Sequence, residues 1–503
     1  MKNQQEFRKE INGFVESIFG HYKPKIIKRP KIIHEAIQGS SVFYEHEISL
    51  IDTPLLQRLH QIHQTGLSFF TYPTAIHTRF DHSLGVATLI NKFVNILNKE
   101  RDRKDSILID EDPYKGDFAN LRIAALLHDC GHTFLSHTSE EIYRTHCIIK
   151  QIKKTKKFSS CRPHEILSYY IVLSTFFKKW FEENILNHYG VDINLETVAD
   201  MIIGIHRDPS KIYLAEIING PFDADKLDYI KRDGFFSGLK IVVDEERLFY
   251  TLTTRLINGK RRIVLKSPIP MEQIVFSKIV LSSSMYYHQK VMACHAMISA
   301  IIDYMNDPSS LPHYFFEGNS LNNPVDYLRL TDYDILRTLS LKKNKLPNFI
   351  QETIWNLFQR NLYIRALTIS ALTIENWEET FPRYIGRLMG EKNERDKLRR
   401  KIYSNIPNKI KKKYNLILHQ IQLSFPKPPL FDEENDETLS GYVVTPNGNY
   451  ITLNSLFPIK EWVKSYIIYK WKGYIFCPPY DEVRDEICKI AKDILKNEGI
   501  KIK

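Results

Sequence analysis

The chain has 503 residues, of which 43% are hydrophobic and 26% are charged, and its formal net charge is +11. These values are ordinary for a folded globular protein, and 27 Tyr and 28 Phe exclude disorder over most of the length. A chain of this size favours two or more lobes. The positive charge fits a polyanionic ligand, either nucleotide phosphates or nucleic acid, or simply a solvated basic surface.

The sequence shows no signal for a membrane or for a disulfide framework. No apolar run reaches the length of a membrane-spanning helix, and residues 1–20 read as a short amphipathic helix without a signal-peptide core. The six cysteines contain no CxxC pair. We therefore expect a cytoplasmic protein with reduced thiols and no membrane association.

The N-terminal part predicts small strands followed by helices. Residues 30–50 combine β-branched residues with a Gly-Ser-Ser turn, which indicates a strand-turn element. Residues 51–63 predict a helix, with Asp52 or Thr53 as N-cap, Pro54 as its first residue and Gly66 after its end. Next come a loop, a long helix from about residue 82 to 100, a polar loop, a buried helix at 119–128 and a basic loop at 151–163.

The remaining chain predicts a mainly α protein with small β additions. We expect helices at 163–188, 194–206 and 271–306, a β-rich stretch at 241–266 with Asn-Gly at 258–259, and mostly helix beyond 320. Residues 426–437 predict a linker, residues 441–453 a short β unit, and residues 481–497 an amphipathic helix.

Chemistry is concentrated where the buried helix ends in His128-Asp129. A buried carboxylate is costly unless it is paired or bound to a metal. Together with His82 and Asp225, this pair supplies two imidazoles and two carboxylates, a set that suits a divalent ion (Mn, Fe, Zn, Co or Mg). Any one of these histidines alone would more often be an ordinary core or surface residue, so the prediction depends on the combination.

Five blocks in this order give the sequence a recognisable pattern. They are IDTPLLQRLHQIHQTG, TRFDHSLGV, ALLHDCGHTFLSHTSE, PHE at 163–165 and DADKLDYIKRD. The H…HD…D order resembles the HD-domain metallohydrolases, and the blocks together resemble their deoxynucleoside triphosphate triphosphohydrolase branch, which includes dGTPase-like enzymes. The resemblance covers roughly residues 30 to 300.

The resemblance implies a role for each matching position. His82, His128, Asp129 and Asp225 take the places of the metal ligands. The implied catalytic residues are His164 as acid-base group, Glu140 as its acidic partner, and His132 and His137 beside the α-phosphate. The implied substrate-binding residues are Arg79, Gln64, Lys226, Tyr229, Asp233, Tyr287 and Lys290.

The implied reaction is attack on the α-phosphorus of a deoxynucleoside triphosphate, giving a deoxynucleoside and inorganic triphosphate. The implied fold is an HD-domain helical core with small β-hairpins and a helical or α+β C-terminal lobe. We expect an N-terminal helix at 1–29, the HD domain at 30–310, a helical lobe at 311–425, and a linker with a small α+β tail at 426–503. A homo-oligomer, from dimer to hexamer, is also expected.

The sequence departs from the family pattern at two places. Glu35-Ala36-Ile37-Gln38-Gly39 stands where family members carry D-P-[IV]-H-G, and Arg58-Leu59-His60 lacks the second arginine of an Arg-x-Arg. In the animal enzymes these regions hold an activating nucleotide, so an allosteric nucleotide site is either missing here or altered in preference. Ile279 and Ser283 replace an arginine and a histidine that the family pattern places upstream of Lys290.

Two other readings remain open. The basic runs at 153–157, 392–401 and 408–415 motivate a phosphodiesterase or nuclease that acts on nucleic acid or a cyclic nucleotide. A non-enzymatic nucleotide sensor, whose part beyond residue 320 binds a partner, is the third. An intact set of four ligands argues against the sensor, because a sensor needs no open metal position.

Overall fold

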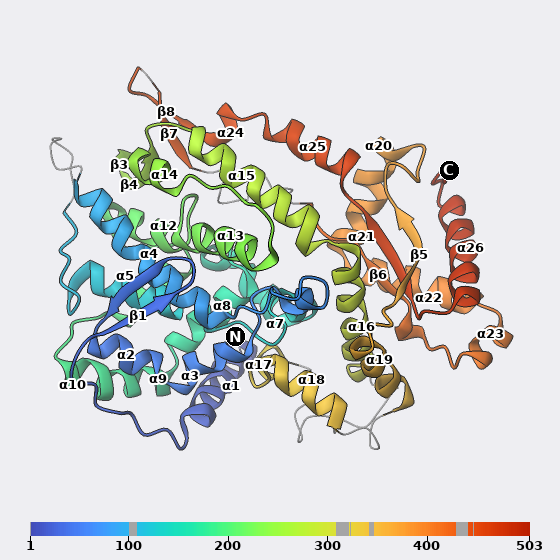
Figure 1. Cartoon of the computed structure of the whole chain (residues 1–503), viewed down its shortest axis with the longest axis horizontal. Helices are drawn as coiled ribbons and strands as arrows, with labels where there is room; N and C mark the ends of the chain where they lie inside the picture. Colours follow the sequence, from blue (N-terminus) through green and yellow to red (C-terminus); the bar gives the residue numbers. More distant parts are fainter. Residues whose placement is uncertain are drawn as a thin grey trace. The chain divides into compact units, whose positions relative to one another are not determined.

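The computed structural model describes residues 2–99, 108–307, 321, 323–341, 347–428, 441–445 and 447–503 (Figure 1). These residues form two compact units. The first unit comprises Met1–Leu281, Asn323–Asp332 and Asp432–Phe457, and the second comprises Ser282–Asn322, Tyr333–Phe431 and Pro458–Lys503. The domain boundaries expected from the sequence stay predictions, and residues 429–437 of the predicted linker lie outside the described residues.

The first unit is built around α5 (Gly116–Leu127), which packs against α4 (Arg79–Lys99) and α11 (Leu195–Ile202). Every residue of α5 from Phe118 to Leu127 is buried, because apolar residues surround the whole helix rather than one face. The end of α5 therefore lies inside the unit, next to the start of α4 and to α13 (Ala224–Ser237), which also packs on α4. The other helices of this unit are α1 (Lys2–Phe19), α2 (Glu45–Ile51), α3 (Pro54–Gln57), α6 (His137–Tyr143), α7 (Cys147–Lys153), α8 (Pro163–Val172), α9 (Thr175–Phe181), α10 (Asn187–Tyr189), α12 (Ile212–Ile218), α14 (Glu245–Thr251), α15 (Ile269–Leu281), α17 (Pro324–Leu328) and α24 (Leu453–Leu456).

Two small sheets complete the first unit. The antiparallel hairpin of β1 (Lys31–Glu35) and β2 (Gly39–Phe43) pairs Glu35 with Gly39 at its turn. The second sheet has the order β3-β4-β7-β8, with β3 (Leu252–Ile257), β4 (Lys260–Leu265), β7 (Tyr442–Val444) and β8 (Tyr450–Thr452). Asn258 and Gly259 both have positive φ between β3 and β4, which confirms the predicted Asn-Gly hairpin.

The second unit packs helices against an antiparallel sheet in the order β5-β9-β6. The central strand β9 (Gly473–Cys477) is buried at every position and lies between β5 (Ile364–Ile369) and β6 (Gln422–Ser424). Helix α26 (Asp481–Asn497) packs on β5 and matches the predicted amphipathic helix in both bounds. The other helices are α16 (Gln289–Met305), α18 (Asp332–Leu341, which begins in the first unit), α19 (Asn348–Phe358), α20 (Trp377–Thr380), α21 (Gly386–Gly390), α22 (Lys392–Asn405), α23 (Asn408–Lys413) and α25 (Ile459–Tyr469).

The mainly α class is confirmed, but several element predictions were wrong in extent. The helix expected at 51–63 is α3 followed by a 3-10 turn over Arg58–Gln61, because the guanidinium of Arg58 is drawn into the core by two carbonyl oxygens. Residues 245–251, expected in a β-rich stretch, form α14, since Asp244 caps the helix by accepting from the backbone N–H of Arg247.

Four further predictions of single elements were too simple. The strand-turn element at 30–50 ends in α2, and the basic loop at 151–163 begins inside α7. The predicted helix 163–188 is divided where Ser174 caps α9, and the helix 271–306 is divided where His288 caps α16. Among the described residues, no helix combines the length and the apolar character needed to cross a membrane.

Candidate metal centre

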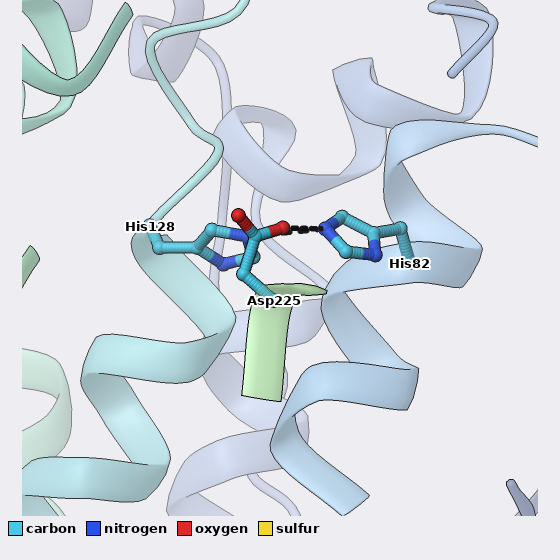
Figure 2. A group of neighbouring side chains, drawn as sticks. All are labelled: His82, His128 and Asp225. Carbon is cyan, nitrogen blue, oxygen red and sulfur yellow. Dashed lines mark hydrogen bonds and ion pairs between the residues drawn. The ribbon is translucent and has the colours of Figure 1, made fainter. Parts of the chain in front are cut away.

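The four predicted metal ligands converge in the first unit from three helices. His82 lies in the first turn of α4, His128 and Asp129 end α5, and Asp225 lies in the first turn of α13. Figure 2 shows the carboxylate of Asp225 directed at the imidazoles of His82 and His128. Its Oδ1 lies 2.9 Å from His82 Nε2 and 3.9 Å from His128 Nε2. Asp129 lies 3.8 Å from the first of these nitrogens and 3.5 Å from the second.

Both imidazoles are held so that Nε2 faces the centre of this group. His82 Nδ1 donates to Asp228 Oδ2 at 2.7 Å, and His128 Nδ1 donates to the carbonyl of Ala125 at 2.7 Å. Metal-binding histidines commonly use their second nitrogen in this way, since the bond fixes the tautomer and the ring orientation. Each of the two carboxylates has an oxygen within 3.9 Å of both imidazole Nε2 atoms. His82, His128 and Asp225 form one group that could hold a metal ion, while Asp129 lies between this group and His132 and His164, so the donors fit a divalent ion.

In this group a positively charged imidazole faces negatively charged carboxylates. Burial lowers the pKa of His82, but hydrogen bonds to Asp225 and Asp228 outweigh burial and raise that pKa to about 10. Burial raises the pKa of Asp129, but Arg79 and His128 outweigh it and hold the pKa well below its usual range. Arg79 is buried and its Nη1 donates to Asp129 Oδ2 at 2.8 Å. In this state the positive charge of protonated His82 balances the negative charge of the carboxylates. A bound cation would supply that positive charge instead.

A second group of histidines adjoins the first. Glu140 Oε2 accepts from His137 Nδ1 at 3.0 Å and from His164 Nδ1 at 2.9 Å, so one carboxylate orients both rings. The ring of His132 stacks on that of His164 with 3.9 Å between centroids, and its Nε2 lies 3.4 Å from Asp129 Oδ1. His137 and Glu140, three residues apart in α6, therefore share one face of that helix.

In this second group, burial lowers the pKa of two histidines, whereas neighbouring imidazoles lower the pKa of Glu140. Burial lowers the pKa of His164 and outweighs the attraction of Glu140. Burial and the charge of Arg79 hold the pKa of His132 well below its usual value. Burial would raise the pKa of Glu140, but His164 and His137 outweigh it and hold that pKa well below its usual range. Glu140 is therefore the ionised group of this cluster at neutral pH.

Close backbone packing brings α8 to this site. A Cβ on Gly131 would lie 2.3 Å from the carbonyl oxygen of His164 and 2.4 Å from the backbone nitrogen of Ser168. Only glycine permits this approach, which sets His164 beside the loop that follows Asp129. The hydroxyl of Ser168 continues the contact by accepting from Gly131 N and donating to the carbonyl of His128, at 2.8 and 2.7 Å.

The turn before His137 is strained and is clamped from several sides. Leu135 and Ser136 both have φ of +53°, which costs a non-glycine residue on the order of 1–3 kcal/mol. Asp332, fully buried, accepts from the backbone N–H of Leu135 and from the backbone and ring N–H groups of His63. Arg79 Nε donates to Ser136 Oγ at 3.1 Å. These bonds determine where His137 enters α6.

The remaining predicted site residues lie in different surroundings. Gln64 is buried and its Oε1 has no hydrogen-bond partner among the described residues. Lys226 Nζ donates to the carbonyl of Gly220 at 2.8 Å and pairs with Asp223. His77 Nε2 donates to Asp233 Oδ1 at 2.7 Å, and Tyr229 is half-buried with its pKa raised by burial. Tyr287 and Lys290 belong to the second unit. The functional roles of all these residues stay predictions.

Sequence reasoning missed several residues that support this site. They are Glu35, Arg58, Ser136, Asp228, Arg232 and Asp332. Asp228 could have been identified from the sequence, because it lies three residues after Asp225 and so shares a helix face with it. Arg232 lies four residues further along the same face and donates from Nε to Asp228 Oδ2 at 2.7 Å.

The part of the chain that contains this site is similar to known proteins. Residues 79–233 match the HD domain family model, a range that contains all four converging ligands. The chain is 26% identical over 340 residues to the deoxynucleoside triphosphate triphosphohydrolase SAMHD1 homolog of Dictyostelium discoideum, covering 67% of this chain and 60% of that protein. It is 27% identical over 354 residues to an uncharacterised protein of Methanocaldococcus jannaschii, covering 69% and 62%.

The fold is also found among solved structures. A phosphohydrolase from Bacteroides thetaiotaomicron matches with a TM-score of 0.61 at 19% identity, covering 89% of this chain and 100% of that one. The likeness supports the fold, while the curated relatives extend beyond the part that this chain matches. The matching domain model, the order of the ligands and their convergence agree, and residues 79–233 of this chain are similar to the HD domain.

Proposed function

We propose that this protein is a divalent-metal-dependent phosphohydrolase that converts deoxynucleoside triphosphates to a deoxynucleoside and inorganic triphosphate. The observation that carries the proposal is the junction of two groups: the four-residue metal set, and the Glu140–His164 pair. Asp129 belongs to the first group and faces His132, which stacks on His164 of the second. An ion site and a proton-donating histidine side by side suit the hydrolysis of a phosphate ester.

His82, His128, Asp129 and Asp225 would hold the ion. When bound, it supplies Lewis-acid polarisation of the scissile phosphate. Arg79, within 2.8 Å of Asp129, adds positive charge beside the same place and favours an anionic substrate. Its buried guanidinium is oriented by Asp129 and Ser136, so little conformational freedom is lost when a phosphate binds.

His164 would act on the leaving oxygen. Its Nδ1 proton is committed to Glu140, so Nε2 is the nitrogen able to carry the proton that is transferred. Water adds to the α-phosphorus and releases one proton to solvent, the bond to the 5′-oxygen breaks, and that oxygen leaves with the proton from Nε2. Burial lowers the pKa of His164 in the free protein, and a bound triphosphate would raise it by stabilising the imidazolium.

The choice of substrate class has two supports. The Dictyostelium discoideum relative is a deoxynucleoside triphosphate triphosphohydrolase by name, and its similarity extends over 340 residues. Gln64 lies beside the site through the bond from Arg79 Nη2 to its carbonyl, and its buried Oε1 is unpaired within the described part of the chain. A sugar hydroxyl would supply the missing donor, since a buried unpaired acceptor costs on the order of 1–3 kcal/mol.

The test is product identity. Purified protein, stripped of metal and reloaded with Mn²⁺, is incubated with each of the four dNTPs, with single-stranded DNA and with a cyclic nucleotide. We expect inorganic triphosphate and deoxynucleoside in equal amounts from at least one dNTP, and no turnover by Asp225→Ala. If triphosphate is absent with all four dNTPs, or DNA is consumed instead, the proposal is wrong.

A further inference from the structure

The turn between β1 and β2 is tied to a buried arginine. Glu35 Oε2 accepts from Arg232 Nη2 at 2.8 Å, and the Glu35 and Arg232 side chains are 8% and 1% exposed. The same carboxylate accepts from the backbone N–H groups of Ile37 and Gln38, so it also closes the turn that carries it. The hairpin itself is largely exposed, and this carboxylate joins it to the interior of the first unit.

Asp228 receives donors from both the hairpin and the metal set. Its Oδ1 accepts from Gln38 Nε2 at 3.0 Å and from Arg232 Nη2 at 3.0 Å. Its Oδ2 accepts from Arg232 Nε at 2.7 Å and from His82 Nδ1 at 2.7 Å. The four donors use both oxygens, so the carboxylate has little freedom to rotate, and the direction of the bond to His82 is set by the other three.

Space for this arrangement is provided by a glycine on α4. A Cβ on Gly85 would lie 2.2 Å from Asp228 Oδ1 and 2.3 Å from Arg232 Nη2. Gly85 is three residues after His82, so the helix that carries the metal ligand also leaves room for the pair that orients it. Burial would raise the pKa of Asp228, but Arg232 and His82 outweigh it and lower that pKa.

We propose that Glu35 and Gln38 are positioning residues of the metal centre, which orient His82 through Arg232 and Asp228. These are the residues of the turn where this chain departs from the family pattern. The inference rests on the proposed metal-dependent function, and it adds that an exposed hairpin of this chain sets the affinity of the ion site. Neither residue is one of the four ligands, and their contacts with Asp228 and Arg232 act on the tautomer and direction of His82.

The expected size follows from how such partners act elsewhere. Removing a residue that orients a metal ligand commonly weakens metal binding by about 10–100-fold. Glu35 acts two contacts further from His82 than Asp228 does, because it reaches Asp228 through Arg232, while Gln38 touches Asp228 directly. We therefore expect Glu35→Gln and Gln38→Ala to weaken Mn²⁺ binding by about tenfold each, at the low end of that range.

The experiment measures Mn²⁺ affinity by calorimetric titration of the full-length, metal-stripped protein. Glu246→Gln, on the exposed surface of α14, and Gln151→Ala, exposed on α7, are the matched controls. The melting temperature of each metal-stripped variant is measured alongside. Gln38→Ala removes one half-exposed amide, so it keeps the test valid if Glu35→Gln disturbs folding.

The possible results distinguish a failure of this proposal from a failure of the proposed ion site. Weaker Mn²⁺ binding by Gln38→Ala, with a melting temperature like that of its control, supports the proposal, and the same loss in Glu35→Gln extends it to the ion pair. Binding within twofold of the parent protein in both hairpin variants overturns it and leaves the proposed function standing. If the parent protein binds no Mn²⁺, the ion site itself is wrong, and this inference is overturned with it.

Discussion

Replacing Glu140 with glutamine tests how much of the proposed catalysis depends on one carboxylate. Glu140 is buried, and its Oε2 accepts from the ring N–H groups of His137 and His164. Glutamine has nearly the same shape and can still accept through its oxygen, so the geometry is retained and the negative charge is lost. His164 then loses the anion that stabilises its imidazolium form.

The magnitude follows from the two bonds. A hydrogen bond to a charged group contributes about 1.5–3 kcal/mol and a neutral one about 0.5–1.5 kcal/mol, so each of the two bonds weakens by about 1 kcal/mol. A total of about 2 kcal/mol corresponds to about a thirtyfold loss in kcat, because each 1.36 kcal/mol is a factor of ten. Binding of the ion is expected to be unchanged, since Glu140 is not among the four ligands.

The assay is steady-state release of triphosphate from the best dNTP at saturating Mn²⁺. Glu141→Gln is the control, because Glu141 is the next residue of α6, has a side chain 63% exposed and pairs with Arg144. We expect Glu141→Gln to keep full activity. If Glu140→Gln keeps kcat within twofold of the parent protein, or if both variants lose activity equally, the account of the Glu140–His164 pair is refuted.

Three further variants test packing and buried charge. Gly131→Ala should abolish activity and lower the melting temperature, because its Cβ would lie 2.3 Å from a backbone oxygen of α8; near-normal activity would contradict the close packing. Glu47→Gln leaves the fully buried Arg122 without its bidentate partner and should cost about 3–5 kcal/mol of unfolding free energy in denaturant titration; a loss below 1 kcal/mol would contradict this. Burial would raise the pKa of Asp303, but its basic neighbours, including Arg399, lower it. That stabilisation is present above the unfolded carboxyl pKa of about 3.9 and is lost as the pH falls below it, so Asp303→Asn should lower the melting temperature at pH 7 and have a smaller effect near pH 3; an equal effect at both pH values would argue against it.

The sequence was sufficient to single out four residues that the structure brings close together, but not the residues that support them. His82, His128, Asp129 and Asp225 could be found because their residue types, order and neighbouring blocks carry a chemical pattern. Their convergence in the first unit agrees with that prediction. The roles assigned to individual residues stay predictions until they are measured.

What the sequence could not show depends on helix rotation and on distant contacts. Asp225 and Asp228 share a face of α13, yet one meets Nε2 of His82 and the other meets Nδ1. Only the rotation of α13 against α4 distinguishes them. Asp332 lies almost two hundred positions from the turn at Leu135 that it clamps, and no local pattern marks that contact.

The turn at 35–39 could be read only as a departure from the family pattern. Its residue types did not reveal that Glu35 reaches Arg232, because β1 and α13 are far apart in the sequence. The length of the helix at 51–63 was overestimated for a related reason. Helix propensity favours a continuous α-helix, but Arg58 contacts the carbonyls of Cys130 and His132, and the chain forms a 3-10 turn there. Local patterns fixed the kind of element, and long-range contacts decided where it ends.

The most direct test of the central claim is the position of the oxygen taken from water. Hydrolysis of the preferred dNTP in ¹⁸O-labelled water, with Mn²⁺, is followed by mass spectrometry of both products. Attack at the α-phosphorus with loss of the 5′-oxygen predicts one labelled oxygen in inorganic triphosphate and none in the deoxynucleoside. Label in the deoxynucleoside, in pyrophosphate or a nucleoside monophosphate, or in orthophosphate would contradict the proposed reaction.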